Sequence, residues 1–349
     1  MPADLQTWDA YASAHPECSI FSRSSWLGLL HRAVKIPLHI QTVAGPDAIL
    51  AGMPLFETSS VLFGRRLTNN PFSLYGDVFA AGPDQAVALL CGCRDLGRQL
   101  GIDAILLRSY QPLPTEAVRE AEFEAVTQRV IPVLALQDTY EQVFSRYKKQ
   151  FKTNLRQIRR NVELDGTYTW AVDSDDVSWR QFHDILCRLF KNKHNMLATP
   201  LHFFTQLRAA LGTEAQLHTL RRAGRMVAGI VILRAGSKAY YAWSATDQAF
   251  DADGAGTFLL DKVIEALCGQ GVDHFDLGVT HPASRQLLFF KTRWGSTLTS
   301  PTLYRYSSAP FPGSDVSAET SFRATRKIIS LMPLNVFKTI STLAYPHLA

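Results

Sequence analysis

The chain has 349 residues, of which 46% are hydrophobic and 19% are charged. This is enough to bury a substantial core in about two domains. The formal net charge of +5 permits an anionic partner but falls short of the composition of a dedicated nucleic-acid-binding protein.

The sequence predicts a cytoplasmic protein. No window of about 18 apolar residues indicates a transmembrane helix, and the first residues lack the basic stretch and apolar core of a signal peptide. The five cysteines are scattered, and the pair Cys91 and Cys93 has no second Cys/His pair nearby at zinc-ligand spacing. We therefore expect reduced thiols and no metal site.

The predicted elements repeat along the chain. The first half indicates hairpin strands over 47–66, a helix over 86–100 and a strand over 101–107. The second half gives two strands over 226–244, a helix over 257–270 and a strand over 271–277. The segments superpose without a gap at one offset, 271 − 101 = 170, which also brings Asp103 onto Asp273.

Chance matching of Leu-rich helices and Gly turns is the alternative to a repeat. The matched order of hairpin, loop, helix and strand favours an internal duplication. The predicted fold class is therefore α/β (α+β), with two copies of one unit, each a mixed sheet flanked by helices.

A basic helix is predicted over 139–161, between the two copies. Asp138 and Glu141 form a capping-box start. An apolar stripe follows at helical spacing: Phe144, Tyr147, Phe151, Leu155 and Ile158. Basic residues run beside it: Arg146, Lys148, Lys149, Lys152, Arg156, Arg159 and Arg160. After Asp138, Glu141 is the one counter-charge in this stretch, so we interpret the helix as facing an anion, with a solvated basic face as the alternative.

A glycine-containing turn precedes the helix of the second copy. Gly254 and Gly256 let the backbone approach a ligand, and the helix start at Ala255 and Thr257 offers free N–H groups to a phosphate. A tight turn without a ligand is the alternative. The first copy has Pro83 in the matching stretch, which removes an N–H donor.

No motif for a nucleophile or a metal is present, and His183 and His194 are not fixed as a pair by their spacing. This favours direct transfer between two bound substrates. The tail over 322–349 is apolar with basic residues at intervals and Pro333 in its middle. It is expected either to pack on the body or to lie on a membrane surface as amphipathic helices.

The stretch 287–295, LLFFKTRWG, places two cations behind an apolar run. We expect the run to anchor this segment in the core and Phe290 to form a wall of a cleft. Lys291 would then face an anion brought by a substrate, with Arg293 as a second contact. An ion pair between Lys291 and Asp276 is the alternative.

Several of these segments resemble the FemAB-like family, also described as peptidoglycan-bridge acyltransferases with tandem GNAT folds. The resemblance rests on Trp8 and the stretch HPECSIFSRSSWLGLL, the loop NPFSLYGD, the basic helix, the strand pair RMVAGIVIL and KAYYAWSAT, and FDLG followed by FFKTRWG. It implies two GNAT-like units over 1–130 and 131–306, followed by a linker and amphipathic tail over 307–349.

The resemblance also implies a function. Such a chain transfers an acyl or aminoacyl group from acyl-CoA or aminoacyl-tRNA, as a co-substrate rather than a tightly bound cofactor, to an amino group of a cell-envelope or exopolysaccharide precursor. The acceptor would carry phosphate or be lipid-linked, and the protein would act in the cytoplasm, with the C-terminal tail as the one segment expected either to pack on the body or to contact the inner face of the membrane. A non-catalytic scaffold that binds a phosphorylated precursor is the alternative.

The implied site combines residues of both copies. Lys291 and Phe290 lie next to the transferred group, and Asp77 accepts a proton. The other substrate-binding residues are Tyr75, Gly76, Trp243, Lys149, Lys152, Arg156, Arg159 and Arg293.

Overall fold

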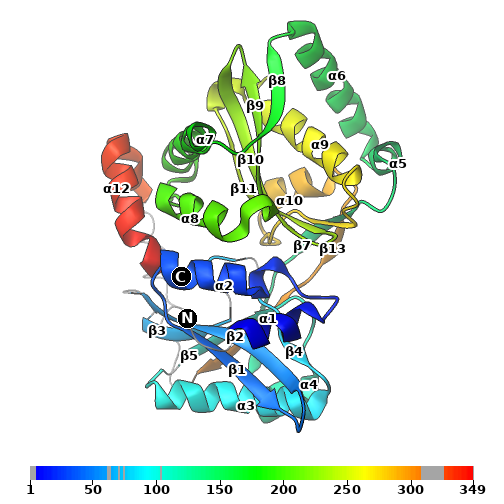
Figure 1. The fold of residues 1–349 in the computed structure, drawn as a ribbon. Helices are drawn as coiled ribbons and strands as arrows, with labels where there is room; N and C mark the ends of the chain where they lie inside the picture. Colours follow the sequence, from blue (N-terminus) through cyan, green and yellow to red (C-terminus); the bar gives the residue numbers. More distant parts are fainter. Residues whose placement is uncertain are drawn as a thin grey trace. The chain divides into compact units, whose positions relative to one another are not determined.

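The computed structural model describes residues 5–60, 64–69, 71–73, 75–102, 104–307 and 326–348. The chain divides into two units (Figure 1). Unit 1 comprises Met1–Arg129, Ser300–Phe322 and Ala344–Ala349, and unit 2 comprises Val130–Thr299 and Arg323–Leu343. Each unit holds a seven-stranded mixed sheet with helices packed on it, which confirms the predicted fold class.

The sheet of unit 1 has the order β1-β2-β3-β5-β14-β6, with β4 paired to β2. Its strands are β1 (Leu38–Ala44), β2 (Ile49–Ser60), β3 (Gly64–Thr68), β4 (Phe79–Ala80), β5 (Ala104–Ser109), β6 (Glu124–Gln128) and β14 (Thr302–Ser307). Its helices are α1 (Leu5–Ser13), α2 (Ser24–Ala33), α3 (Pro83–Gln99) and α4 (Thr115–Glu120). Helix α3 starts with Pro83 at a position that suits proline, and it buries Ala86, Leu89, Leu90 and Cys93 against the sheet.

The sheet of unit 2 has the order β13-β7-β12-β11-β10-β9-β8. Its strands are β7 (Ile131–Ala135), β8 (Tyr168–Asp173), β9 (Ala215–Arg222), β10 (Arg225–Ala235), β11 (Lys238–Thr246), β12 (His274–Asp276) and β13 (Thr297–Thr299). Its helices are α5 (Tyr140–Ser145), α6 (Lys149–Asp165), α7 (Asp176–Leu189), α8 (Leu201–Leu211), α9 (Ala255–Cys268), α10 (Arg285–Thr292) and α12 (Leu334–Ala344). Helices α7 and α8 cover one face of this sheet, and α6 and α9 cover the other (Figure 1).

The two units share the same strand–helix–strand connection, and the second strand of each connection starts at equivalent positions of the repeat. In each, a strand of a hairpin leads through a helix to a parallel neighbour, by β3–α3–β5 in unit 1 and by β11–α9–β12 in unit 2. The parallel pairing begins at Ala104 in unit 1 and at His274 in unit 2, and 274 − 104 = 170, the offset that aligns the two halves of the sequence. This agreement supports a duplicated unit. Asp103, one of the residues matched in the sequence, lies outside the described residues.

Two predicted boundaries differ from the structure. Strand β14 was expected in the second unit, but it pairs antiparallel with β5 and β6 of unit 1, because the chain returns to the first sheet after β13. The basic helix over 139–161 is two helices, α5 and α6, separated at 146–148. Its capping box is formed by Thr139 and Gln142 rather than by Asp138 and Glu141, and α6 ends at Gly166 with φ of 64°.

Candidate active site

A cavity of about 310 Å³ lies in unit 2, beside the place where β11 and β12 separate. The parallel pairing of these strands stops at Tyr240, while β11 continues to Thr246. A bulge at Ala242, between the partners of Val231 and Ile232, further bends β11. The cavity is lined by Leu189, Lys193, His194, Ala228, Gly229, Ile230, Tyr241, Ser244, Ala245, Thr246, Asp251, Gly254, Gly256, Thr257, Leu287, Phe290 and Lys291.

The turn before α9 forms one end of this cavity. Gly254 has φ of 74°, and a Cβ there would lie 2.7 Å from Ile158 Cδ1. A Cβ on Gly256 would lie 2.5 Å from the Thr246 hydroxyl. Both glycines are therefore needed for the backbone path and for close packing, whatever else the turn does. Three of the four predicted cofactor-binding residues line the cavity, whereas Ala255 is buried in the core of unit 2.

Lys291 lies in the cavity wall on α10, and its side chain is largely buried at 7% exposure. Its ammonium group donates a 2.8 Å hydrogen bond to the Gly278 carbonyl. Burial lowers the pKa of Lys291 to about 8, and the nearby charge of Asp276 opposes that shift. The lysine therefore borders the cavity, and its ammonium group contacts the Gly278 carbonyl.

The apolar run before Lys291 does not anchor the segment in the core as expected. It forms α10, which leaves Leu287 and Phe289 exposed at 45% and 61%, while Lys291 and Trp294 are buried. In a helix, residues three or four apart share a face. The buried face is therefore set by Phe290, Lys291 and Trp294, not by the contiguous apolar letters.

Arg293 does not itself line the cavity, but it contacts two residues that do, Thr257 and Phe290, near the start of α9. Its guanidinium donates to the Thr257 hydroxyl at 3.0 Å and stacks over the rings of Phe151 and Phe290, at 4.2 and 4.5 Å from their centroids. Burial lowers the pKa of Arg293 to about 10. Over the described ranges, rings and a hydroxyl surround this cation and no carboxylate pairs with it. A partly buried cation beside a helix N-terminus is a place where an anion is stabilised.

The basic helix has a counter-charge that its own sequence does not contain. Asp261, which is fully buried in α9, accepts hydrogen bonds from Arg159 Nε at 2.6 Å and from the Tyr140 hydroxyl at 2.5 Å. Burial raises the pKa of Asp261, and the contacts with Tyr140 and Arg159 oppose this. Arg159 thus joins α6 to α9 instead of facing a substrate.

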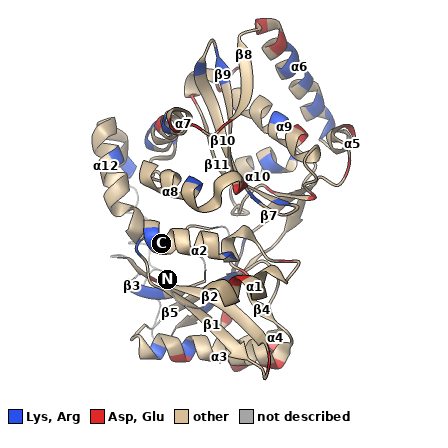
Figure 2. Cartoon of the chain, in the orientation of Figure 1, with Lys and Arg blue, Asp and Glu red and all other residues tan. Residues whose placement is uncertain are grey.

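The other predicted residues of α6 lie toward solvent. Figure 2 shows Lys and Arg positions along the length of α6. Lys149 and Arg156 are exposed, and Arg156 stacks over the ring of Phe144 at 5.3 Å. The ammonium group of Lys152 donates to the Ser145 carbonyl at 2.9 Å.

In unit 1, the structure gives Tyr75, Gly76 and Asp77 structural contacts. The buried carboxylate of Asp77 accepts hydrogen bonds from the backbone N–H and the hydroxyl of Ser19, both at 2.7 Å. The Tyr75 ring packs on Tyr110, and the N–H of Gly76 donates to the Arg108 carbonyl. Asp77, the expected proton acceptor, is therefore engaged by Ser19 within unit 1.

Trp243 points away from the cavity that its neighbours on β11 line. Its indole N–H donates to the Thr199 hydroxyl at 3.1 Å, and its ring packs edge-on against Phe203 and Phe204 of α8. It therefore supports the sheet face covered by α8.

His194 is a cavity residue that the sequence did not single out as catalytic. The segment Phe190–His194 continues α7 as a π-helical turn, a feature frequent at functional sites. Burial, followed by the charge of Lys193, lowers the pKa of His194. Lys193 pairs with Asp251 at 2.9 Å across the cavity wall. Within the described ranges no cluster of three His, Cys, Asp or Glu side chains is placed to bind a metal.

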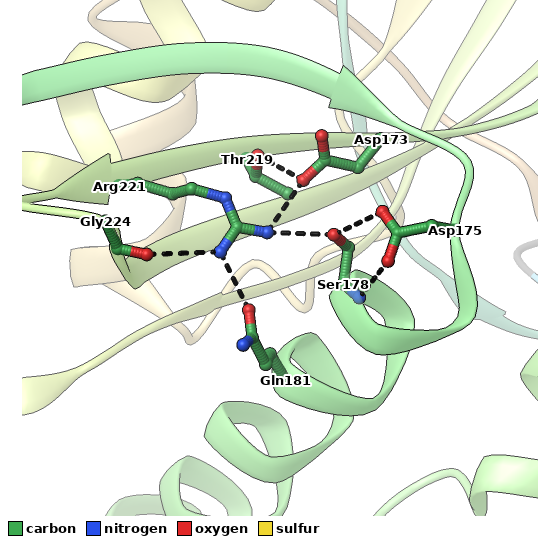
Figure 3. A network of polar contacts seen from close by, with 7 residues as sticks. All are labelled: Asp173, Asp175, Ser178, Gln181, Thr219, Arg221 and Gly224. Carbon is green, nitrogen blue, oxygen red and sulfur yellow. Dashed lines mark hydrogen bonds and ion pairs between the residues drawn. The ribbon is translucent and has the colours of Figure 1, made fainter.

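A polar network holds the N-terminal end of α7 on the sheet (Figure 3). Arg221 of β9 donates to Asp173 at 2.9 Å and to the Ser178 hydroxyl at 2.8 Å. Ser178 in turn donates to Asp175, which caps the N-terminus of α7. A charge-assisted network of this kind fixes the position of a helix more firmly than apolar packing alone.

Comparisons with known proteins bear on the fold of the chain. Residues 136–284 match the family model described as an acetyltransferase (GNAT) domain. A search of curated proteins finds no match to this chain.

Three solved structures resemble the chain over most of its length. FemX has a TM-score of 0.68 at 13% identity, covering 88% of this chain and 96% of FemX. The C-terminal domain of a putative lysylphosphatidylglycerol synthetase from Agrobacterium fabrum has a TM-score of 0.56 at 13% identity, with 93% and 96% covered. A tandem GNAT protein from the clavulanic acid biosynthesis pathway has a TM-score of 0.54 at 10% identity, with 88% and 94% covered. The chain has a tandem GNAT fold. At this identity the likeness concerns the fold alone, and it confirms the resemblance to FemAB-like proteins at that level.

Proposed function

We propose that this chain is an N-acyltransferase. It moves an acyl or aminoacyl group from acyl-CoA or aminoacyl-tRNA directly to an amino group of a cell-envelope or exopolysaccharide precursor. The observation that carries the proposal is the positive charge at the α9 end of the unit 2 cavity. There Arg293 lacks a carboxylate partner among the described residues, and Lys291 stays buried in the adjoining wall.

Acyl-CoA is the donor that this end of the cavity favours. GNAT acyltransferases use acyl-CoA as a co-substrate, and its diphosphate is a compact anion. The start of α9 offers unpaired N–H groups, and Thr257 and Arg293 add a hydroxyl and a guanidinium. Gly254 and Gly256 let the backbone of this turn pack closely on Ile158 and Thr246.

The transfer needs no covalent enzyme intermediate. The lone pair of the acceptor amine attacks the acyl carbonyl carbon, the C–S bond of the thioester breaks, and the CoA thiolate leaves. His194 takes the proton that the amine loses, because its lowered pKa keeps the imidazole neutral at physiological pH. With a pKa of about 8, Lys291 is mostly protonated at pH 7, and its charge stabilises the carbonyl oxygen or a phosphate of the acceptor.

The acceptor class is inferred from charge. Lys149 and Arg156 provide exposed positive charge on α6, and Ile158 of the same helix contacts the start of α9. A phosphate-bearing or lipid-linked amine is therefore the proposed acceptor, with the chain acting in the cytoplasm or at the inner membrane surface. Aminoacyl-tRNA remains the alternative donor, for which the same exposed charges would contact phosphates.

The test measures donor binding and transfer separately. Calorimetry with acetyl-CoA should give a defined Kd, and Arg293→Gln should raise that Kd about 10- to 100-fold, as expected for loss of a charge-assisted contact. Arg160→Gln, at an exposed position of α6, is the matched control and should leave the Kd unchanged. Because Arg293 packs between two rings, Thr257→Val provides a second variant with less effect on packing.

The alternative, a non-catalytic scaffold, predicts a different pattern. Wild-type protein would bind a phosphorylated precursor through Lys149 and Arg156, and it would release no free CoA or tRNA with any amine acceptor. A third outcome concerns the donor. If the wild type fails to bind acetyl-CoA but binds aminoacyl-tRNA in a gel-shift assay, aminoacyl-tRNA replaces acyl-CoA as the donor.

A further inference from the structure

The tail of the chain is docked on unit 2 by one side. Residues 326–331 are helical, and α12 follows after Pro333. Ile329 and Phe337 are buried in a small core with Cys187 and Ala198, around the end of α7. Two polar contacts add to this packing: Lys338 pairs with Asp184 at 2.5 Å, and the Ser341 hydroxyl accepts from the Ala198 N–H at 3.3 Å.

Four apolar side chains of the tail are exposed, next to the exposed polar side chains of Asn335, Thr339 and Thr342 on α12. Ile328 and Leu331 are 58% and 75% exposed, and Val336 and Leu343 are 46% and 70% exposed. The first two are three residues apart and the last two are seven apart, so each pair lies on one face of its helix. Single exposed apolar residues are common on proteins, but several of them within one short segment indicate an interaction surface.

The charge around this apolar face has one sign. Residues 326–343 contain no Asp or Glu, and Arg326 and Lys327 are exposed. The ammonium group of Lys191 donates to the Ser330 carbonyl at 2.9 Å, which places a further cation at the edge of the tail. Asp184 is already paired with Lys338.

We propose that the outer face of the tail docks on an anionic lipid bilayer. A bilayer surface accepts apolar side chains at the depth of the acyl boundary and places anionic headgroups next to basic ones. A second copy of the chain fits this surface less well, because a two-fold interface sets the same surface against itself and brings its like charges together. Over the described residues no helix is long and apolar enough to cross a membrane, so the tail lies in the plane of the interface.

Docking there would bring a wall of the cavity close to the lipid headgroups. The tail packs on Phe190 and Leu197, and these residues flank Lys193 and His194, which line the cavity. If the proposed acyl transfer is correct, the acceptor is then an amine carried by a membrane lipid. The docking itself does not depend on the transfer, because its evidence is the surface of the tail.

The test is co-sedimentation of the full chain with vesicles. Protein should bind vesicles of phosphatidylcholine with about one third phosphatidylglycerol and should bind pure phosphatidylcholine vesicles much more weakly. Leu331→Glu and Leu343→Glu should each lower the partition coefficient by about tenfold or more, because a carboxylate replaces an inserted side chain. Leu164→Glu is the matched control, since Leu164 is 74% exposed on α6, and it should have no effect.

A second pair of variants tests the charge. Arg326→Gln with Lys327→Gln should lower binding by about 25-fold, at about fivefold for each charge, and Arg98→Gln with Arg119→Gln at exposed sites of unit 1 should not. Binding that is absent in the wild type, or that is equal in the tail variants and the controls, overturns the proposal. So does a dimer in solution that Leu331→Glu dissociates without any vesicle binding by the wild type. If the wild type binds vesicles but transfers no acyl group, the proposed function is refuted while the docking proposal stands.

Discussion

Lys291→Met is the substitution that separates the catalytic role of this residue from its structural role. Methionine has nearly the length of lysine and removes only the charge and the hydrogen-bond donor. Burial lowers the pKa of Lys291 from 10.5 to about 8. At about 1.4 kcal/mol per pKa unit, the charged form at pH 7 therefore costs the folded state about 3 kcal/mol.

The hydrogen bond to Gly278 offsets part of that cost. Removing the donor leaves a buried carbonyl without its 2.8 Å partner, which costs about 1–3 kcal/mol. The net change at pH 7 is therefore expected between zero and about 2 kcal/mol of added stability for the variant. A buried cation that is unfavourable for folding is retained at functional sites because it acts on a ligand.

The pH dependence of the unfolding free energy provides an independent check that the charge on Lys291 destabilises the folded state. Because the folded pKa lies below the unfolded value, the unfolded state binds more protons between pH 8 and pH 10.5. The stability of the wild type should therefore rise with pH across that window, relative to Lys291→Met, and the full penalty is present below pH 8.

The assay is urea unfolding of both proteins at pH 7 and pH 9.5, combined with acyl-transfer rates. Turnover of Lys291→Met should fall at least about 100-fold, while Lys262→Met on the exposed side of α9, where Lys262 pairs with Glu265, should retain it. Wild-type turnover in Lys291→Met, or a loss of more than about 2 kcal/mol of stability, would refute this reasoning.

Three further outcomes are expected. The kcat/KM of the wild type is expected to rise with pH below about pH 6.5, because burial and Lys193 lower the pKa of His194. His194→Gln should lower kcat and remove that rise. An unchanged pH profile in the variant would exclude His194 as the base. Asp261→Ala should destabilise the fold by about 3–5 kcal/mol in urea, since it leaves Arg159 without its buried partner; Asp251→Ala, at an exposed pair, should cost less than about 1 kcal/mol. Gly254→Ala should cost about 1–3 kcal/mol of stability through its positive φ and its contact with Ile158. Adding Ile158→Ala should relieve only the contact, so full recovery in the double variant would show that the backbone is not strained.

The sequence by itself determined the features that depend on local periodicity. Phe151 and Leu155 of the predicted apolar stripe are buried, because helical spacing places residues four apart on one face of α6. Tyr147 is buried as well, although it lies in the break between α5 and α6. The glycine turn before α9 and the repeat at an offset of 170 were also readable, since the connection from strand through helix to strand is set by short-range signals.

Tertiary structure decided the contacts that join distant parts of the chain. Asp261 lies 102 residues from Arg159, and no local pattern shows that the two would meet in a core. The same holds for β14, which joins the sheet of unit 1 after the whole of unit 2, and for His194, which reaches the cavity through a π-helical turn. In the stretch LLFFKTRWG, composition suggested a buried apolar run, but the helix of α10 turned Phe289 outward and Lys291 inward. Which side of a short helix is buried depends on what it packs against, and that information lies elsewhere in the chain.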